Sequence, residues 1–217
     1  MKSELALKND VEEELRWEPA VNAAHIGVSV KQGIVTLIGH VPSYAEKYGA
    51  EKAAQRVRGV KALANELDVR LPGSHQRTDE DIAAACVAVV AAHVTLPAEG
   101  ITVVVNKGWI TLTGKVDWQY QKVTAAAAVR YLAGVIGVTN DIQLAMHPTA
   151  HDVQDKITAA LKRSAEVDAS KITVEARDGK VALHGTVRSW AEREEAQLAA
   201  WAAPGVIAVT NDIAISP

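Results

Sequence analysis

The 217-residue chain has no phenylalanine, one cysteine and two methionines, and its only aromatics are five tryptophans and four tyrosines. Aliphatic side chains and alanine must therefore fill its core. The single cysteine, Cys86, excludes an internal disulfide framework and a cysteine metal cluster. The hydrophobic share of 48% and the charged share of 23% are ordinary for a globular chain, which argues against disorder over most of the length.

Long apolar runs and an excess of positive charge are also missing. No uninterrupted apolar stretch approaches the roughly 18 residues that a membrane-spanning helix needs. Residues 1–20 contain several carboxylates and no apolar signal-peptide segment, so we expect a cytoplasmic location, or a periplasmic one if an export signal has been removed. The net charge of −3 argues against a broad basic surface, and no nucleic-acid partner is expected.

Three copies of one sequence pattern account for nearly the whole chain. The pattern Gly-x-[Val/Ile]-x-Leu-x-Gly-x-Val occupies residues 33–41, 108–116 and 179–187. A Gly-Val pair begins twenty residues after each second glycine, and each copy then closes on Asn-[Asp/Glu]-[Ile/Leu]. The copies are offset by 75 and 71 residues, and nine of the 14 glycines fall in three aligned columns. The aligned positions are Gly33, Gly39, Gly59 and Asn65 in the first copy, Gly108, Gly114, Gly134 and Asn140 in the second, and Gly179, Gly185, Gly205 and Asn211 in the third.

A period near 70 residues is long enough for each copy to have its own small core. We therefore expect three tandem domains, at residues 1–72, 76–146 and 149–217, separated by short linkers that contain proline. Because neither linker is long enough for a free tether, we expect the domains to pack on one another. The pairs beginning at Asp10, Asp81 and Asp152 suggest a common start to each copy, which would leave the first copy four residues short before its first strand.

Hydrophobic periodicity predicts the same order of elements in each copy: helix, strand, strand, helix, strand. A tight turn such as Arg177-Asp178-Gly179 makes the first two strands an antiparallel hairpin. A right-handed crossover through the second helix places the third strand parallel to the second. The predicted fold class is α+β, with three units that are each a three-stranded mixed sheet covered on one face by two helices.

No arrangement of residues points to catalysis. His147 and His151 are four residues apart beside Asp152, but they lie in a linker, and Pro148 opposes a continuous helix that displays both. The setting of Cys86 in an apolar helix suits a small buried hydrophobe. The repeated glycines bracket a strand instead of opening a helix, so they form no phosphate loop. We expect no enzyme activity, no metal and no cofactor, and a structural role for the repeated asparagines at the start of the last strand.

The repeated glycine, Gly-Val and Asn-[Asp/Glu]-[Ile/Leu] motifs, in this order of elements, resemble the BON domain family. The resemblance covers nearly the whole chain, three times over. It implies a bacterial, non-enzymatic module of the cell envelope that engages phospholipid surfaces or protein partners and serves osmotic or envelope stress. Many members are exported or anchored by lipid, whereas this chain shows neither a signal sequence nor a lipid-attachment cysteine.

The second helix of the first copy is one candidate contact surface. Residues 44–61 contain five basic side chains against two carboxylates. Such a helix can lie on anionic lipid headgroups, with tyrosines at its start as interfacial anchors, or it can be a solvated face with no partner. The candidate contact residues on it are Tyr44, Tyr48, Lys52, Arg56 and Arg58.

The middle copy is the other candidate, because its helices are apolar on nearly every side. Residues 82–94 contain no charged side chain, and residues 123–133 contain only Arg130. A helix of this kind is expected to be buried on more than one side. Trp118 and Tyr120 add aromatic anchors at the entry to the second helix. The sequence thus leaves two functions open: an adaptor that binds a phospholipid surface or an envelope partner, and a scaffold that self-assembles into a homo-oligomer through its central domain.

Overall fold

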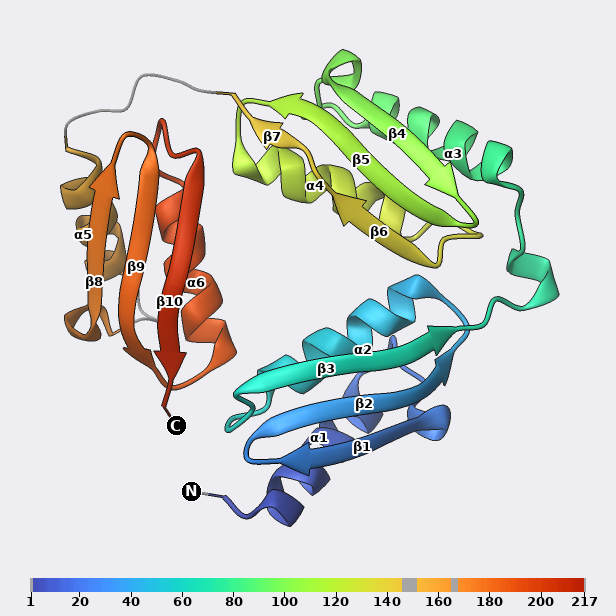
Figure 1. Ribbon diagram of the computed structural model, residues 1–217, viewed down its shortest axis with the longest axis horizontal. Helices are drawn as coiled ribbons and strands as arrows, with labels where there is room; N and C mark the ends of the chain where they lie inside the picture. The colour runs from blue at the N-terminus through green and yellow to red at the C-terminus, as the bar shows by residue number, and fades with distance from the viewer. Residues whose placement is uncertain (1, 146–151, 165–167, 217) are drawn as a thin grey trace.

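A computed structural model describes residues 2–145, 152–164 and 168–216, so His147, His151 and the second linker lie outside the described residues. The described chain forms three α+β units, as predicted (Figure 1). Copy 1 comprises α1 (Glu4–Trp17), β1 (Ile26–Lys31), β2 (Ile34–Val41), α2 (Tyr44–Arg56) and β3 (Ala62–Val69). Copy 2 comprises α3 (Asp79–Ala92), β4 (Ile101–Asn106), β5 (Trp109–Val116), α4 (Gln119–Arg130), β6 (Gly137–Asn140) and β7 (Gln143–Leu144). Copy 3 comprises α5 (Val153–Arg163), β8 (Ile172–Arg177), β9 (Lys180–Val187), α6 (Trp190–Trp201) and β10 (Ala208–Ile215).

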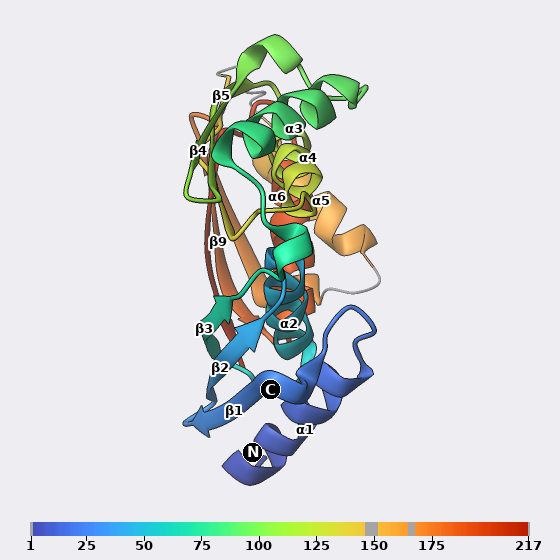
Figure 2. The ribbon, with the colours of Figure 1, turned by 90° about the vertical axis from the view of Figure 1, so that its right-hand side faces the viewer.

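Each sheet has the predicted mixed topology, with the glycine-bracketed strand in the middle. β2 pairs antiparallel with β1 and parallel with β3, and copies 2 and 3 repeat this pattern. In copy 2 the last strand is divided into β6 and β7, which both pair with β5. The two helices of each copy cover the same face of its sheet, which agrees with the predicted fold class (Figure 2).

The predicted alignment of the first helices is wrong. α1 and α3 begin and end 75 residues apart, the same offset as the glycine motifs, so copy 1 lacks no residues before its first strand. The equivalent core positions are Leu7, Ile82 and Val153, which are all buried. The Asp-Val and Asp-Ile pairs are not equivalent, because Asp10 lies in the middle of α1, whereas Asp81 lies in the first turn of α3 and Asp152 is the N-cap residue of α5. Burial against the sheet determines the true register.

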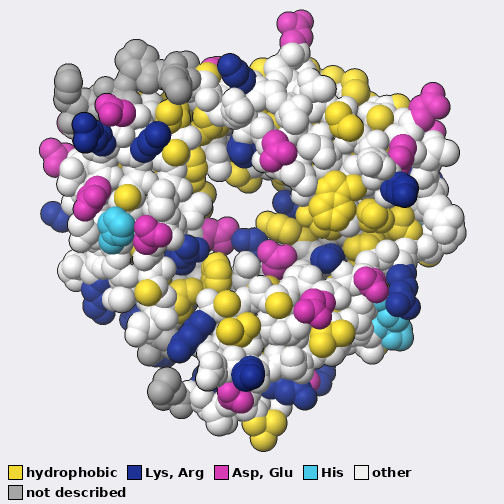
Figure 3. Space-filling model, viewed as in Figure 1, with side chains coloured by type: hydrophobic (Ala, Val, Ile, Leu, Met, Phe, Trp, Pro, Cys, Tyr) yellow, Lys and Arg dark blue, Asp and Glu magenta, His cyan; other side chains and the backbone are white. Residues whose placement is uncertain are grey.

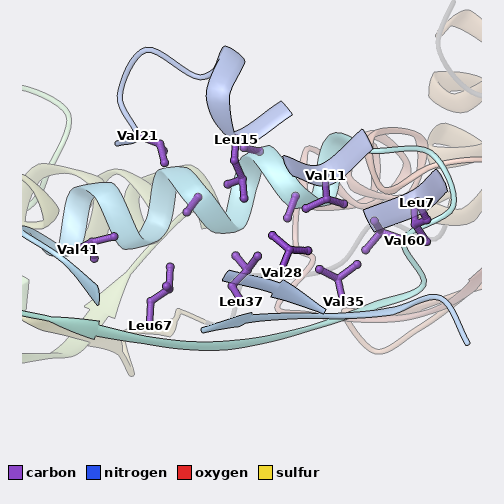
Figure 4. Packing of buried hydrophobic residues seen from close by; sticks show 13 residues of the cluster. Leu7, Val11, Leu15, Val21, Val28, Val35, Leu37, Val41, Val60 and Leu67 are labelled. Atoms are coloured by element: carbon purple, nitrogen blue, oxygen red, sulfur yellow. The ribbon is translucent and has the colours of Figure 1, made fainter. Parts of the chain in front are cut away.

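Each copy has its own apolar core between helices and sheet, and aliphatic side chains fill all three. In copy 1, Val11 and Leu15 point from α1 toward Val35 and Leu37 of β2 (Figure 4). Ala50, Ala53 and Ala54 of α2 are fully buried against them. The small alanines let helix and sheet approach closely, which accounts for a dense core without phenylalanine.

The second glycine of each motif is required by a close approach of two backbones. A Cβ atom at Gly39 would lie 2.0 Å from the carbonyl oxygen of His25, and the φ angle of Gly39 is +129°. Gly114 and Gly185 are in the same position, where a Cβ atom would lie 2.0 and 1.9 Å from a carbonyl oxygen. No side chain fits such a gap, so the three copies share this glycine for a steric reason.

The three copies form a ring. In Figure 1 they surround a common centre, and the space-filling view is hollowed there (Figure 3). The side view shows the three sheets along one face of the ring and the helices along the other (Figure 2). Every sheet therefore presents its uncovered side to the same direction.

Candidate interaction surfaces

Tyr44 and Tyr48, at the start of α2, contact copy 2. Tyr44 is half-buried against the copy 2 core, its hydroxyl hydrogen-bonds to the backbone of Val138, and burial raises the pKa of its phenol. The guanidinium of Arg130 lies over the Tyr48 ring, 3.4 Å from the ring centroid. At that distance the cation and the aromatic face attract each other. These two tyrosines thus contribute to a joint between copies.

Copy 3 meets copy 1 through the start of α6. The indole nitrogen of Trp190 donates a hydrogen bond of 2.9 Å to the carbonyl oxygen of Val60, and its ring packs against the copy 1 core. One helical turn further on, Glu194 forms an ion pair of 2.9 Å with Lys52 of α2. Lys52, a predicted lipid contact, therefore has a carboxylate partner in another copy.

Copy 2 faces copy 3 across a small cavity of about 260 Å³. Trp118 lines it from the start of α4, and Trp201, Pro204 and Val206 line it from the end of α6 and the turn that follows. Trp118 is 42% exposed at this joint, and Tyr120, which is 54% exposed, is not among the residues that line the cavity.

The three joints have the same sense around the ring. In each, residues at the start of one copy's second helix meet residues at or beyond the end of the next copy's second helix or near its last strand. The order is copy 1 to copy 2, copy 2 to copy 3, and copy 3 back to copy 1. A head-to-tail contact generates a closed ring when its rotation closes. Here the ring closes within a single chain, after its three copies of the repeat.

The other two predicted contact residues of the first copy, Arg56 and Arg58, contact only their own copy or line its cavity. Arg56 donates to Glu14 of α1 at 2.9 Å and to Glu18, just beyond the end of α1, at 2.6 Å, and the bond to Glu18 lowers the pKa of that carboxyl. Arg58 is exposed and, with Lys61, lines a cavity of about 760 Å³ at the start of α1. The predicted basic residues therefore do not form one surface: Lys52 pairs with copy 3, Arg56 pairs with carboxylates of its own copy, and Arg58 lines a cavity.

The aligned asparagines tie the second helix to the last strand. Asn65 and Asn140 donate from their amides to the carbonyl oxygens of Lys47 and Lys122, and Asn211 does the same to Arg193. The amide oxygen of each accepts from the backbone N–H two residues later. One side chain thereby satisfies a helix carbonyl and fixes the turn of the strand.

The outward side of α3 is an exposed apolar surface, and the helix has no charged side chain after Asp81. Ile82, Cys86 and Val90 of this helix face the core. Val87 is 61% exposed and Val94, just beyond the helix, is 99% exposed. Ala84, Ala88 and Ala91 are exposed beside them. We call these five residues the α3 face. The prediction that this apolar helix is buried on more than one side is wrong for α3, because the helix lies away from the joints and only its core side is covered.

Chemistry-bearing side chains are dispersed over the described residues. Burial raises the pKa of the Cys86 thiol to about 11, so this cysteine is a thiol and a poor nucleophile at neutral pH. Within the described ranges, no three His, Cys, Asp or Glu side chains come close enough together to hold a metal ion. None of the described helices is both long and apolar enough to cross a membrane.

Three small α+β units joined head to tail, each with the same glycine and asparagine framework, define a tandem-repeat protein. The model of the BON domain matches residues 3–70, 78–146 and 149–217, and the chain belongs to this family. Over 127 residues it is 32% identical to osmotically-inducible protein Y of Escherichia coli (strain K12). The match covers 57% of this chain and 63% of that relative, so it spans less than two thirds of the relative's length.

Two solved structures of CdsD, a structural protein of the type III secretion system of Chlamydia trachomatis, also align. The C-terminal domain of CdsD is 15% identical, with all of both chains covered and a TM-score of 0.27. The other CdsD structure is 16% identical over 98% of this chain and 93% of that one, with a TM-score of 0.28. At these TM-scores neither structure supports an argument about this chain.

Proposed function

We propose that this protein is a non-catalytic adaptor of the osmotic stress response that binds phospholipid membrane surfaces through the α3 face. The similarity to osmotically-inducible protein Y supports the connection with osmotic stress. The observation that carries the membrane contact is the uncharged, exposed apolar surface of α3.

The equivalent helices of the other copies support this choice of surface. The position of Val87 is occupied by Glu12 in α1, and the position of Ala91 is occupied by Arg16 in α1 and Lys162 in α5. A charged side chain at these positions keeps a helix face in water. Copy 2 alone replaces both charges with apolar side chains.

Burial of the α3 face is the driving term for a reversible contact with the interface. Fully burying an exposed valine contributes about 1.5–3 kcal/mol. Because Val94 is 99% exposed and Val87 is 61% exposed, the two contribute about 2.5–5 kcal/mol at most, which offsets part of the entropy that binding costs. The net charge of −3 adds no attraction to anionic lipid, so binding should change little with salt.

Vesicle co-sedimentation of the intact chain tests the proposal. We expect Val87→Glu, which installs the copy 1 residue, to reduce binding to neutral and anionic vesicles at least about tenfold. Leu5→Glu is the matched control, because Leu5 is 68% exposed on α1 and takes the same charge change. Equal binding by Val87→Glu and the unaltered chain would refute the membrane role of this face.

Self-association through the same face is the second candidate function, since an apolar helix surface can also be covered by a second copy. Light scattering of the intact chain without lipid distinguishes the two. A dimer that Val87→Glu converts to a monomer supports the scaffold, whereas a monomer that binds vesicles supports the adaptor.

A further inference from the structure

The uncovered side of the copy 2 sheet has one aromatic side chain among small polar ones. On β5, Ile110 and Leu112 point to the core, so Trp109 and Thr111 point outward. The broadest gathering of hydrophobic side chains on the sheet side of the ring lies over this copy (Figure 3). This surface is opposite the α3 face, because helices and sheets occupy the two faces of the ring (Figure 2).

The Trp109 indole lies flat on the sheet and is held in place. A Cβ atom built on Gly137, in the neighbouring strand β6, would lie 2.4, 2.5 and 2.7 Å from three atoms of the six-membered ring. Three such similar distances mean that the ring covers Gly137, where no side chain fits. The indole nitrogen also donates a hydrogen bond of 2.9 Å to the hydroxyl of Thr139.

One ring face is therefore fixed against the backbone, and the opposite one is free, which agrees with the 47% exposure of Trp109. Packing against Gly137 explains why an aromatic stabilises this strand pair. It does not explain why the residues around the ring are nearly all small and neutral.

The outward strand positions next to the ring have hydroxyl and amide groups and one aliphatic side chain, Val104, and the nearest cation in sequence is Lys107 of the hairpin turn. Asn106 is opposite Trp109, and the next pair along the hairpin is Val104 with Thr111. Thr139 of β6 follows Thr111 in the same row. Copy 3 differs at the same positions, since Arg177, Lys180 and Glu175 stand where copy 2 has Asn106, Trp109 and Val104.

We propose that this surface binds an oligosaccharide of six-membered-ring sugars, with one sugar ring stacked on Trp109. The apolar face of such a sugar presents C–H groups, which carry slight positive charge and are attracted to the negative face of an indole. The hydroxyls at the rim of the sugar then exchange hydrogen bonds with the threonine hydroxyls and with the amide of Asn106. Because the indole is already held, little conformational entropy is lost on binding.

The platform around Trp109 has a size that suits a small occupant. Three strands about 4.8 Å apart, read over two alternate residues, give a platform of roughly 10 by 7–14 Å. A stable protein contact needs about 800 Å² from each partner, several times more than this platform offers. Two linked sugar rings match it in length and in their mixture of apolar faces and hydroxyl rims.

Nuclear magnetic resonance of the intact chain tests the site with cellotetraose, chitotetraose and maltotetraose as probes. We expect the Trp109 indole N–H signal, identified by its loss in Trp109→Lys, to shift saturably with one or more of these probes, with a dissociation constant on the order of 1 mM. The variant Trp109→Lys installs the residue of copy 3, and it should weaken binding at least about tenfold. The four other indole signals should stay unmoved by sugar in the unaltered chain.

Trp17→Ala is the matched control, because Trp17 lies at the end of α1, on no sheet, and is more exposed than Trp109, at 81%. It should bind the sugar as the unaltered chain does. If Trp109→Lys misfolds, Trp109→Tyr keeps a ring over Gly137 and should retain part of the affinity. The site is refuted if no probe shifts the Trp109 signal saturably, or if Trp17→Ala weakens binding as much as the Trp109 variants. Neither result affects vesicle binding by α3, so the two proposals fail independently.

Discussion

At the scale of single residues, the fold depends on positions where only one size of side chain fits. Gly39 shows this most directly, because the backbone of His25 leaves no room for a methyl group. We expect Gly39→Ala to destabilise copy 1 by about 3 kcal/mol, since the backbone must separate to admit the new atom. Hydrogen exchange should be faster in copy 1 and unchanged in copy 3. Gly73→Ala is the control, because nothing lies within 4 Å of its added Cβ atom, and an equal effect there would contradict the steric explanation.

Cys86 links burial to pH. Its pKa is raised to about 11 in the folded chain, so the folded state favours the neutral thiol and loses stability as the unfolded thiol ionises. The stability of copy 2 should therefore fall between about pH 9 and 11. Comparing urea unfolding of the intact chain and Cys86→Ala across this range measures the effect. A fall of the same size in Cys86→Ala would show that the thiol is not its cause.

At the scale of elements, the second helix and the last strand of each copy are connected by one asparagine side chain. Removing Asn140 leaves the Lys122 carbonyl and the Ile142 amide without its hydrogen bonds. We expect Asn140→Ala to cost about 1–3 kcal/mol, seen as a lower melting temperature of copy 2 by circular dichroism. Asn106→Ala, an exposed asparagine on β4, should leave melting nearly unchanged. Equal melting temperatures of Asn140→Ala and Asn106→Ala would contradict this role of the Asn140 side chain.

The elements also show how far the sequence can predict the structure. Strand order and the position of each helix can be predicted from local signals. These are the two-residue hydrophobic period of strands, the 3.6-residue period of helices and tight turns such as the one at Gly179. The register of α1 does not, because Asp10 and Asp81 look equivalent until burial identifies Leu7 and Ile82 as the true pair.

The candidate contacts were harder to predict, because they too depend on tertiary packing, in this case between residues of different copies. Tyr44, Tyr48 and Lys52 look like an exposed basic helix, but their partners come from residues about 80 to 150 positions away in other copies. No periodicity records such contacts. The apolar character of α3 was visible in the sequence, whereas its freedom from the joints was not.

At the scale of the molecule, ring closure determines which surfaces stay free. The joint between copies 1 and 3 has no linker of its own and depends on Trp190 and on the Lys52–Glu194 pair. The ion pair is partly exposed and contributes only about 0.2–1 kcal/mol, so the indole is the stronger contact. We expect Trp190→Ala to open the ring while each copy keeps its core. Its sedimentation coefficient should fall, with an unchanged far-ultraviolet circular dichroism spectrum. Trp17→Ala should sediment as the unaltered chain does, and a fall there too would contradict this role of Trp190.

Small-angle X-ray scattering of the intact chain in dilute solution tests the ring most directly. A compact chain of 217 residues has a radius of gyration of about 17 Å, and a ring with a hollow centre should be only slightly larger. We expect such a value, with a distance distribution that ends sharply at the width of the ring. A much larger radius with a long tail, as three beads on a string produce, would contradict closure and the assignment of α2 and α6 to the joints.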